Sequence, residues 1–221
     1  MSNASATLSP SGERVRGTRP AYLSARMRGP RRHRALRRGF TLVELLAVVA
    51  MIGILSALAL VGYRKFLNSA GAAEAAAVVQ GIRGAQEAYR AEMLVYLGCS
   101  GCGGTGCAQG SGNLGTYYPM LSPGKPKYHW IQPSHGDFAC WRLLNVTTDG
   151  PVRFGYAVVA GLPDTITAIP VGLASPPTWP TPVSQPWFVV EAKGDRDGDG
   201  VPALFLASSL RGEIYSENDS E

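Results

Sequence analysis

The feature that most constrains this chain is an apolar run from Phe40 to Val61. Its 22 residues contain one charged side chain, Glu44. At about 1.5 Å of rise per residue, a helix of this length spans a hydrocarbon core of about 30 Å. Gly, Pro or charged residues interrupt every later apolar stretch. We therefore expect one membrane crossing, which excludes a multi-span transporter.

A basic arm precedes this run. Residues 1–39 contain ten Arg and one acidic residue, whereas residues 40–221 contain 11 basic and 15 acidic residues. The positive-inside rule then places the N-terminus in the cytoplasm and everything after Val61 outside the inner membrane, in the periplasm. Only Tyr22 adds an aromatic ring to the arm. We interpret the arm as a topology signal and do not expect it to bind nucleic acid.

Several export signals compete for this segment. An ordinary signal peptide would be cut after Ala57-Leu58-Ala59 and release a soluble periplasmic binding module, although Glu44 is foreign to such an apolar region. Arg37-Arg38 could begin a twin-arginine signal, but the apolar run is more hydrophobic than such signals require. If no peptidase cut this segment, the protein would stay anchored in the membrane as a receptor or an adhesin.

A further interpretation of this segment is more specific. The stretch Arg37-Arg38-Gly39-Phe40-Thr41-Leu42-Val43-Glu44-Leu45-Leu46 resembles the class III signal of type IV pilins and of the pseudopilins of type II secretion systems. The resemblance implies that a prepilin peptidase cuts after Gly39 and methylates the amine of Phe40, and that Glu44 becomes the fifth mature residue. It implies a structural, non-enzymatic subunit that leaves the inner membrane to polymerise with other pilin subunits in a surface pilus or a periplasmic pseudopilus.

The chain departs from this family at two places. Gly53 matches the family's mid-helix glycine, but Val61-Gly62 stands where a proline is usual, so a kinked helix is not expected. A leader covering residues 1–39 is also long for the family. Translation from Met27 would give a leader of ordinary length.

Glu44 has a physical role that does not depend on resemblance. A carboxylate at membrane depth costs about 2.5–3.5 kcal/mol on insertion scales, so it needs a partner or a place near the interface. Cleavage after Gly39 would create that partner, an α-amine at Phe40 that is largely cationic at neutral pH. Between subunits, the same pair would fix the register of packed helices.

The residues after the membrane segment predict an α+β fold. Apolar residues recur at three- and four-residue steps to Tyr96, which favours one helix from about Phe40 to Tyr96, amphipathic over residues 62–97. Residues 98–221 then form a β-rich domain that begins with a glycine-rich loop. We expect an antiparallel sheet from the runs Phe138–Val146, Val152–Ala160, Thr165–Pro170, Trp187–Ala192, Ala203–Ser208 and Glu213–Tyr215. The five prolines of Leu173–Pro186 indicate an extended surface segment instead.

Four cysteines, Cys99, Cys102, Cys107 and Cys140, could form a metal site or two disulfides. Export to an oxidising compartment favours disulfides. Three pairings are possible, and we favour one that bridges the loop to Cys140, which we expect on a strand.

Alternating carboxylates at Asp195, Asp197 and Asp199, with glycines between them and the carbonyl of Val201, resemble the first half of a calcium loop. Leu206 replaces the glutamate that would complete an EF-hand, and a simple Asp-Gly hairpin turn is the alternative. We favour calcium, because three unneutralised carboxylates in one turn would repel one another. His33, His129 and His135 have no nucleophile or acid partner in the pattern, so we expect no catalytic site.

Overall fold

The computed structural model describes residues 39–164, 173–180 and 183–219. It divides into two compact units, residues 1–46 and residues 47–221. Residues 39–46 are the described part of the first unit, and the other described residues belong to the second.

Helix α1 runs without a break from Leu42 to Met93. The expected helix is thus confirmed, with ends two or three residues inside the predicted ones. Leu94 ends it in a left-handed conformation, with φ of 62°, and its backbone nitrogen donates to the Arg90 carbonyl at 2.8 Å. The absence of a proline after Val61 agrees with this uninterrupted helix.

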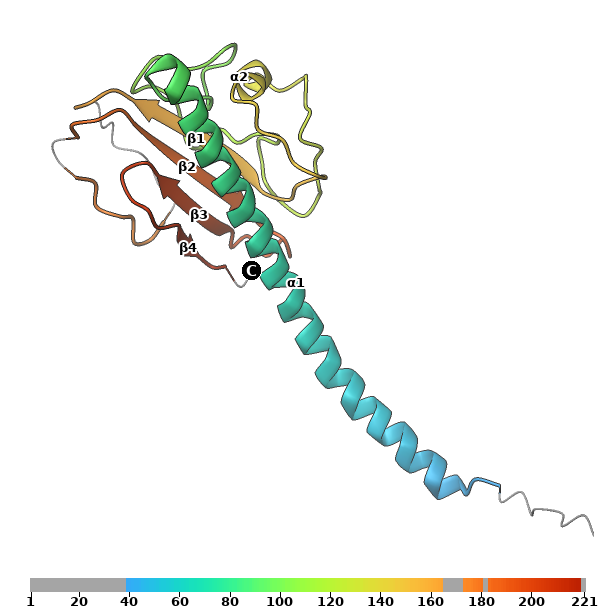
Figure 1. The fold of residues 1–221 in the computed structure, drawn as a ribbon. Coiled ribbons are helices and arrows are strands. Elements are labelled where there is room, and N and C mark those ends of the chain that lie inside the picture. The colour runs from blue at the N-terminus through green and yellow to red at the C-terminus, as the bar shows by residue number, and fades with distance from the viewer. Residues whose placement is uncertain (1–38, 165–172, 181–182, 220–221) are drawn as a thin grey trace, which may run out of the picture. The chain divides into compact units, whose positions relative to one another are not determined.

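The second half of α1 packs on a β-sheet (Figure 1). Its buried residues recur at steps of three and four, as an amphipathic helix requires: Gly71, Ala75, Val79, Ile82 and Gln86. Burial of a side chain such as Val79 or Ile82 stabilises this contact by about 1.5–3 kcal/mol. Tyr96 is buried as expected, whereas Met93 is 56% exposed, because the helix ends there.

The sheet has four antiparallel strands in the order β1-β2-β3-β4. Each strand pairs with the next one in the chain. The strands are β1 (Gly155–Gly161), β2 (Trp187–Gly194), β3 (Ala203–Ser208) and β4 (Tyr215–Glu217). The predicted β3 is confirmed residue for residue, and β2 is two residues longer than predicted. β1 starts later than expected, because Val152 forms an isolated bridge with Tyr128.

The predicted strand Phe138–Val146 is wrong. Residues Phe138–Leu143 form a short helix, α2, that carries Cys140. The buried residues Cys140, Trp141 and Leu144 are spaced as on one side of a helix, and the run contains no β-branched residue before Val146. The predicted strand Thr165–Pro170 lies outside the described residues.

The two faces of the sheet carry separate hydrophobic clusters. α1 and α2 cover the first face, where Tyr118, Trp130 and Trp141 belong to the larger cluster. The described part of the proline-rich segment covers the second face, where Trp179 packs against the smaller cluster. As predicted, residues 173–180 contain no strand. Leu173 is nevertheless buried, so the segment is attached to the sheet rather than wholly on the surface.

Candidate processing and assembly site

Thr41 caps the N-terminus of α1. Its hydroxyl oxygen accepts a hydrogen bond from the Glu44 backbone nitrogen at 3.2 Å, and its carbonyl accepts the first helical bond, from the Leu45 nitrogen at 3.1 Å. Thr-x-x-Glu is the capping-box pattern, in which a threonine satisfies a free N–H of the first turn. The motif that resembles a prepilin junction thus also begins a helix. Sequence reasoning used Glu44 for its charge and missed this pattern.

The predicted junction is accessible. Gly39 and Phe40 precede the helix, and Phe40 is 80% exposed. Phe40 was expected inside the helix, but α1 starts two residues later. A peptidase acts on extended chain more readily than on helix, because helical backbone groups are already hydrogen-bonded. Glu44 lies in the first turn of α1, where a negative charge is favoured by the helix dipole.

The first part of α1, from Leu42 to Val61, presents mainly apolar side chains to its surroundings, and Glu44 is its one charged residue. Every large apolar side chain from Leu42 to Val61 is between 46% and 78% exposed. Among the described residues, α1 is the one helix long and apolar enough to cross a membrane, and none of its most apolar 18-residue window is buried. This apolar part of α1 is therefore not packed in the core of the described structure. Such a surface needs lipid or other apolar helices around it.

A family model described as the prokaryotic N-terminal methylation motif matches residues 34–60. The chain carries a class III prepilin signal. The match includes the junction, the cap and most of the exposed apolar helix, and it ends before the sheet begins. Comparison with curated proteins and with solved structures finds no match. With α1 packed on an antiparallel sheet, the chain has the α+β layout of a pilin.

Two disulfides close the glycine-rich loop. Cys99 pairs with Cys140 and Cys102 pairs with Cys107, so the bridge to Cys140 is confirmed, although Cys140 lies on α2 and not on a strand. Asp137 accepts hydrogen bonds from the nitrogens of Gly101 and Gly103 at 3.0 and 2.9 Å. With its cysteines paired, this loop offers no thiolate to a metal.

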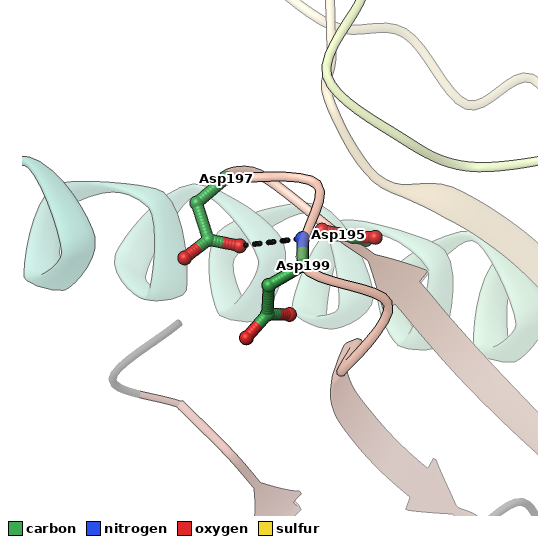
Figure 2. A group of neighbouring side chains, drawn as sticks. All are labelled: Asp195, Asp197 and Asp199. Carbon is green, nitrogen blue, oxygen red and sulfur yellow. Dashed lines mark hydrogen bonds between the residues drawn. The ribbon is translucent and has the colours of Figure 1, made fainter.

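The three aspartates of the predicted calcium loop lie in the turn between β2 and β3. Asp195, Asp197 and Asp199 each offer a carboxylate oxygen, and these oxygens lie within 4.8 Å of one another. Figure 2 shows Asp197 beside the backbone nitrogen of Asp199, which donates to it at 3.2 Å. Asp195 accepts from Gly198 and Gly200 at 2.6 and 3.1 Å. The structure therefore shows a hairpin turn in which three carboxylates lie close together, and calcium binding there stays a prediction.

The same turn is fastened to α1. The Arg196 guanidinium donates to the carbonyl of Asn68 at 2.7 Å and to its side-chain oxygen. A Cβ on Gly71 would lie 2.2 Å from an Arg196 nitrogen, so only glycine leaves room for this contact. Sequence reasoning missed the contact, because its partners lie 128 residues apart.

Two buried polar residues were also missed. Gln86 is fully buried, and its amide binds both the carbonyl and the nitrogen of Leu97, at 2.6 and 3.0 Å. Glu191, on β2, is 2% exposed and accepts a hydrogen bond from the Tyr117 hydroxyl at 2.6 Å. Burial raises the pKa of Glu191, while Tyr117 and the Lys193 charge oppose that rise. Helical spacing places Gln86 on the buried face of α1, but no local sequence pattern distinguishes Glu191 from an exposed residue.

Proposed function

We propose that the protein is a structural subunit of a type IV pilus or a type II secretion pseudopilus, cut after Gly39 and polymerised through α1. The observation that carries this proposal is a single helix that begins in a prepilin signal, exposes its apolar first half and packs its second half on a sheet. One element then serves as membrane anchor before assembly and as fibre core afterwards. A prepilin peptidase and other pilin subunits are its partners.

The energetic basis is the exposed apolar surface of residues 42–61. In water, that surface would cost about 25 cal/mol for each Å². Lipid removes the cost before assembly, and neighbouring helices remove it in a filament. Residues 62–221 stay on the periplasmic side in this proposal, because the ten arginines of the arm hold the N-terminus in the cytoplasm. A structural role needs no catalytic group.

Glu44 sets the axial register of each subunit's helix against the helices of its neighbours. Among apolar helices its carboxylate forms an ion pair with the newly formed Phe40 amine, because an unpaired charge surrounded by apolar side chains is costly. A subunit shifted along the fibre would lose that pair. Soluble export after Ala59 would instead discard the junction, the cap and Glu44, the segment that the methylation motif matches.

Two substitutions test this proposal in cells that carry the peptidase. Gly39→Leu should leave an uncut membrane precursor, because the peptidase reads the small residue before the junction. Glu44→Leu should still be cut, but should lower the yield of sheared filaments about tenfold or more, because the amine loses its partner. Ser56→Leu, a change without charge in the same helix, is the control. Normal filament yield from Glu44→Leu would contradict the register role.

We further propose that Asp195, Asp197 and Asp199, with the Val201 carbonyl, bind calcium. Support comes from the donor set, since hard cations prefer carboxylate and carbonyl oxygens, and from the 4.8 Å grouping of the carboxylates. Bound calcium would offset two of the three clustered negative charges and so stabilise the β2–β3 turn and its Arg196 contact with α1.

A further inference from the structure

An apolar pocket of about 330 Å³ lies beside α2. Aromatic rings make up much of its lining, from Tyr118, Trp130, Phe138 and Trp141, and Ile131 stands at it with 70% of its surface exposed. Tyr118 stacks on Trp141 at 5.3 Å, and Trp130 meets both rings edge-on at 5.2 and 5.5 Å. These rings hold one another in place, so the pocket is preformed.

A second unused feature is the segment Ser175-Pro176-Pro177-Thr178-Trp179-Pro180. The sequence has no charged residue between Asp164 and Glu191, and Pro176, Thr178 and Pro180 are exposed. The segment is held by charged side chains on both sides. Glu217 accepts from the nitrogens of Ala174 and Ser175 at 2.8 and 3.1 Å, and Arg211 donates to the Thr178 carbonyl at 2.9 Å.

These two features have complementary chemistry. Pro-x-x-Pro segments, here Pro177 to Pro180, dock into aromatic-lined grooves because their extended backbone is already ordered and loses little entropy. The contacts of Glu217 and Arg211 restrict this segment further, which lowers the cost of binding.

The two features cannot meet within one chain. The pocket's rings belong to the cluster on the first face of the sheet, and Trp179 belongs to the cluster on the second face. A contact between them must join two copies through different surfaces. Such a heterologous contact repeats without closing and builds a helical filament when its rotation does not form a ring.

Exposed charges near the two features include one pair of opposite sign, while Arg211 places a positive charge on the segment itself. Arg142 is the one charged residue that lines the pocket, and it is exposed. The exposed carboxylate of Asp219 lies just beyond β4, two residues after Glu217, which holds the proline-rich segment. Opposite charges at the rim of an interface set its register and disfavour wrong arrangements.

We propose that the aromatic pocket beside α2 binds the Ser175–Pro180 segment of a second copy, with Arg142 facing Asp219 of that copy. This proposal rests on the proposed filament function and adds to it a contact between globular domains. Helices in the fibre core would supply most of the cohesion, and this contact would orient each domain against its neighbour.

The test uses the full chain in cells that assemble it, with a photo-crosslinking phenylalanine analogue at Ile131. A second position, Leu121, is the matched control, because it is exposed and does not line the pocket. Irradiated filaments should yield a crosslinked dimer in which Ile131 is joined to the peptide that contains Pro176 and Pro180. Arg142→Glu and Asp219→Lys should each reduce that product about fivefold, and the double variant should restore it.

The outcomes are separable. Filaments that form from cut subunits, but whose Ile131 crosslinks fall on another segment or are absent, would overturn this interface and leave the proposed function standing. Equal crosslinking in the Arg142→Glu variant would overturn the charge pairing. A chain that is never cut after Gly39 and never polymerises would overturn the proposed function and the interface with it.

Discussion

At the scale of single residues, Glu191 is the least expected feature of the sheet. One carboxylate oxygen accepts from Tyr117, and the other, buried, has no hydrogen-bond partner among the described residues. A buried ionised group in this situation costs stability. The direction of the pKa shift therefore predicts a dependence of folding on pH.

The sign of that dependence follows from the raised pKa of Glu191 in the folded chain. Its stabilising contribution is present in full below the ordinary glutamate pKa and is lost as pH rises through the folded value. Glu191→Gln should match the unsubstituted chain at pH 4 and be more stable by about 1 kcal/mol at pH 8, since the amide carries no charge. Denaturant unfolding of the full chain in detergent measures this. A gain of the same size for the exposed Glu213→Gln would contradict it.

Residue identities located the candidate sites whose parts lie mostly close together in the sequence, while the chemistry proposed for the aspartates and for Gly39 stays a prediction. The cysteines, the aspartates and the Gly39–Glu44 motif all carried local signals, and the structure groups the aspartates and pairs the cysteines. Glu191, Gln86 and Arg196 depend on partners brought close only by folding. The role of such residues follows from their burial and their partners in the folded chain, and a single sequence does not reveal either one.

At the scale of elements, the two disulfides should differ in what they stabilise. The Cys99–Cys140 bridge spans 41 residues and joins the loop to α2, whereas Cys102–Cys107 spans five. On chain-entropy grounds, replacing the first pair by serines should cost about 4 kcal/mol of unfolding free energy, and replacing the second about 2. Alkylation of the exported, unreduced chain should label no cysteine. Labelling of all four, or equal losses, would contradict this assignment.

The β2–β3 turn provides a second prediction at this scale. Saturating calcium, at about 100 times its Kd, should raise unfolding free energy by about 2.7 kcal/mol relative to chelator, because it binds the folded turn. Asp197→Ala should remove the difference, while Asp149→Ala, in another exposed turn, should retain it. Thermal melting of the full chain in detergent is the measurement. Superimposable melting curves in calcium and in chelator would leave the segment a hairpin turn.

The elements that periodicity predicted well are those whose pattern is long or bounded by clear turns. α1 repeats its spacing over many turns, and β2 and β3 are bounded by proline, glycine or aspartate. The strand prediction for residues 138–146 failed, because a short apolar run fits a strand or a short helix equally well. Packing of Cys140 and Trp141 beside Tyr118 decides for the helix.

At the scale of the whole molecule, the chain joins three parts with opposed solvent requirements. The cationic arm favours the cytoplasm. The apolar half of the helix requires lipid or other helices around it. The β-sheet domain is cross-linked by disulfides, which are stable in an oxidising compartment outside the inner membrane. In the proposed function, cleavage after Gly39 would remove the first part and would add a charge beside the second. The proposed function therefore depends on where the mature chain begins.

Mass spectrometry of the N-terminal peptide, from cells that carry the peptidase, tests this directly. The account predicts that the mature chain begins at Phe40 and that its amine bears one methyl group, an added mass of about 14 Da, since methylation replaces one hydrogen by CH₃. A mature chain beginning at Leu60, or an intact leader ending in uncut Gly39-Phe40, would contradict the central claim.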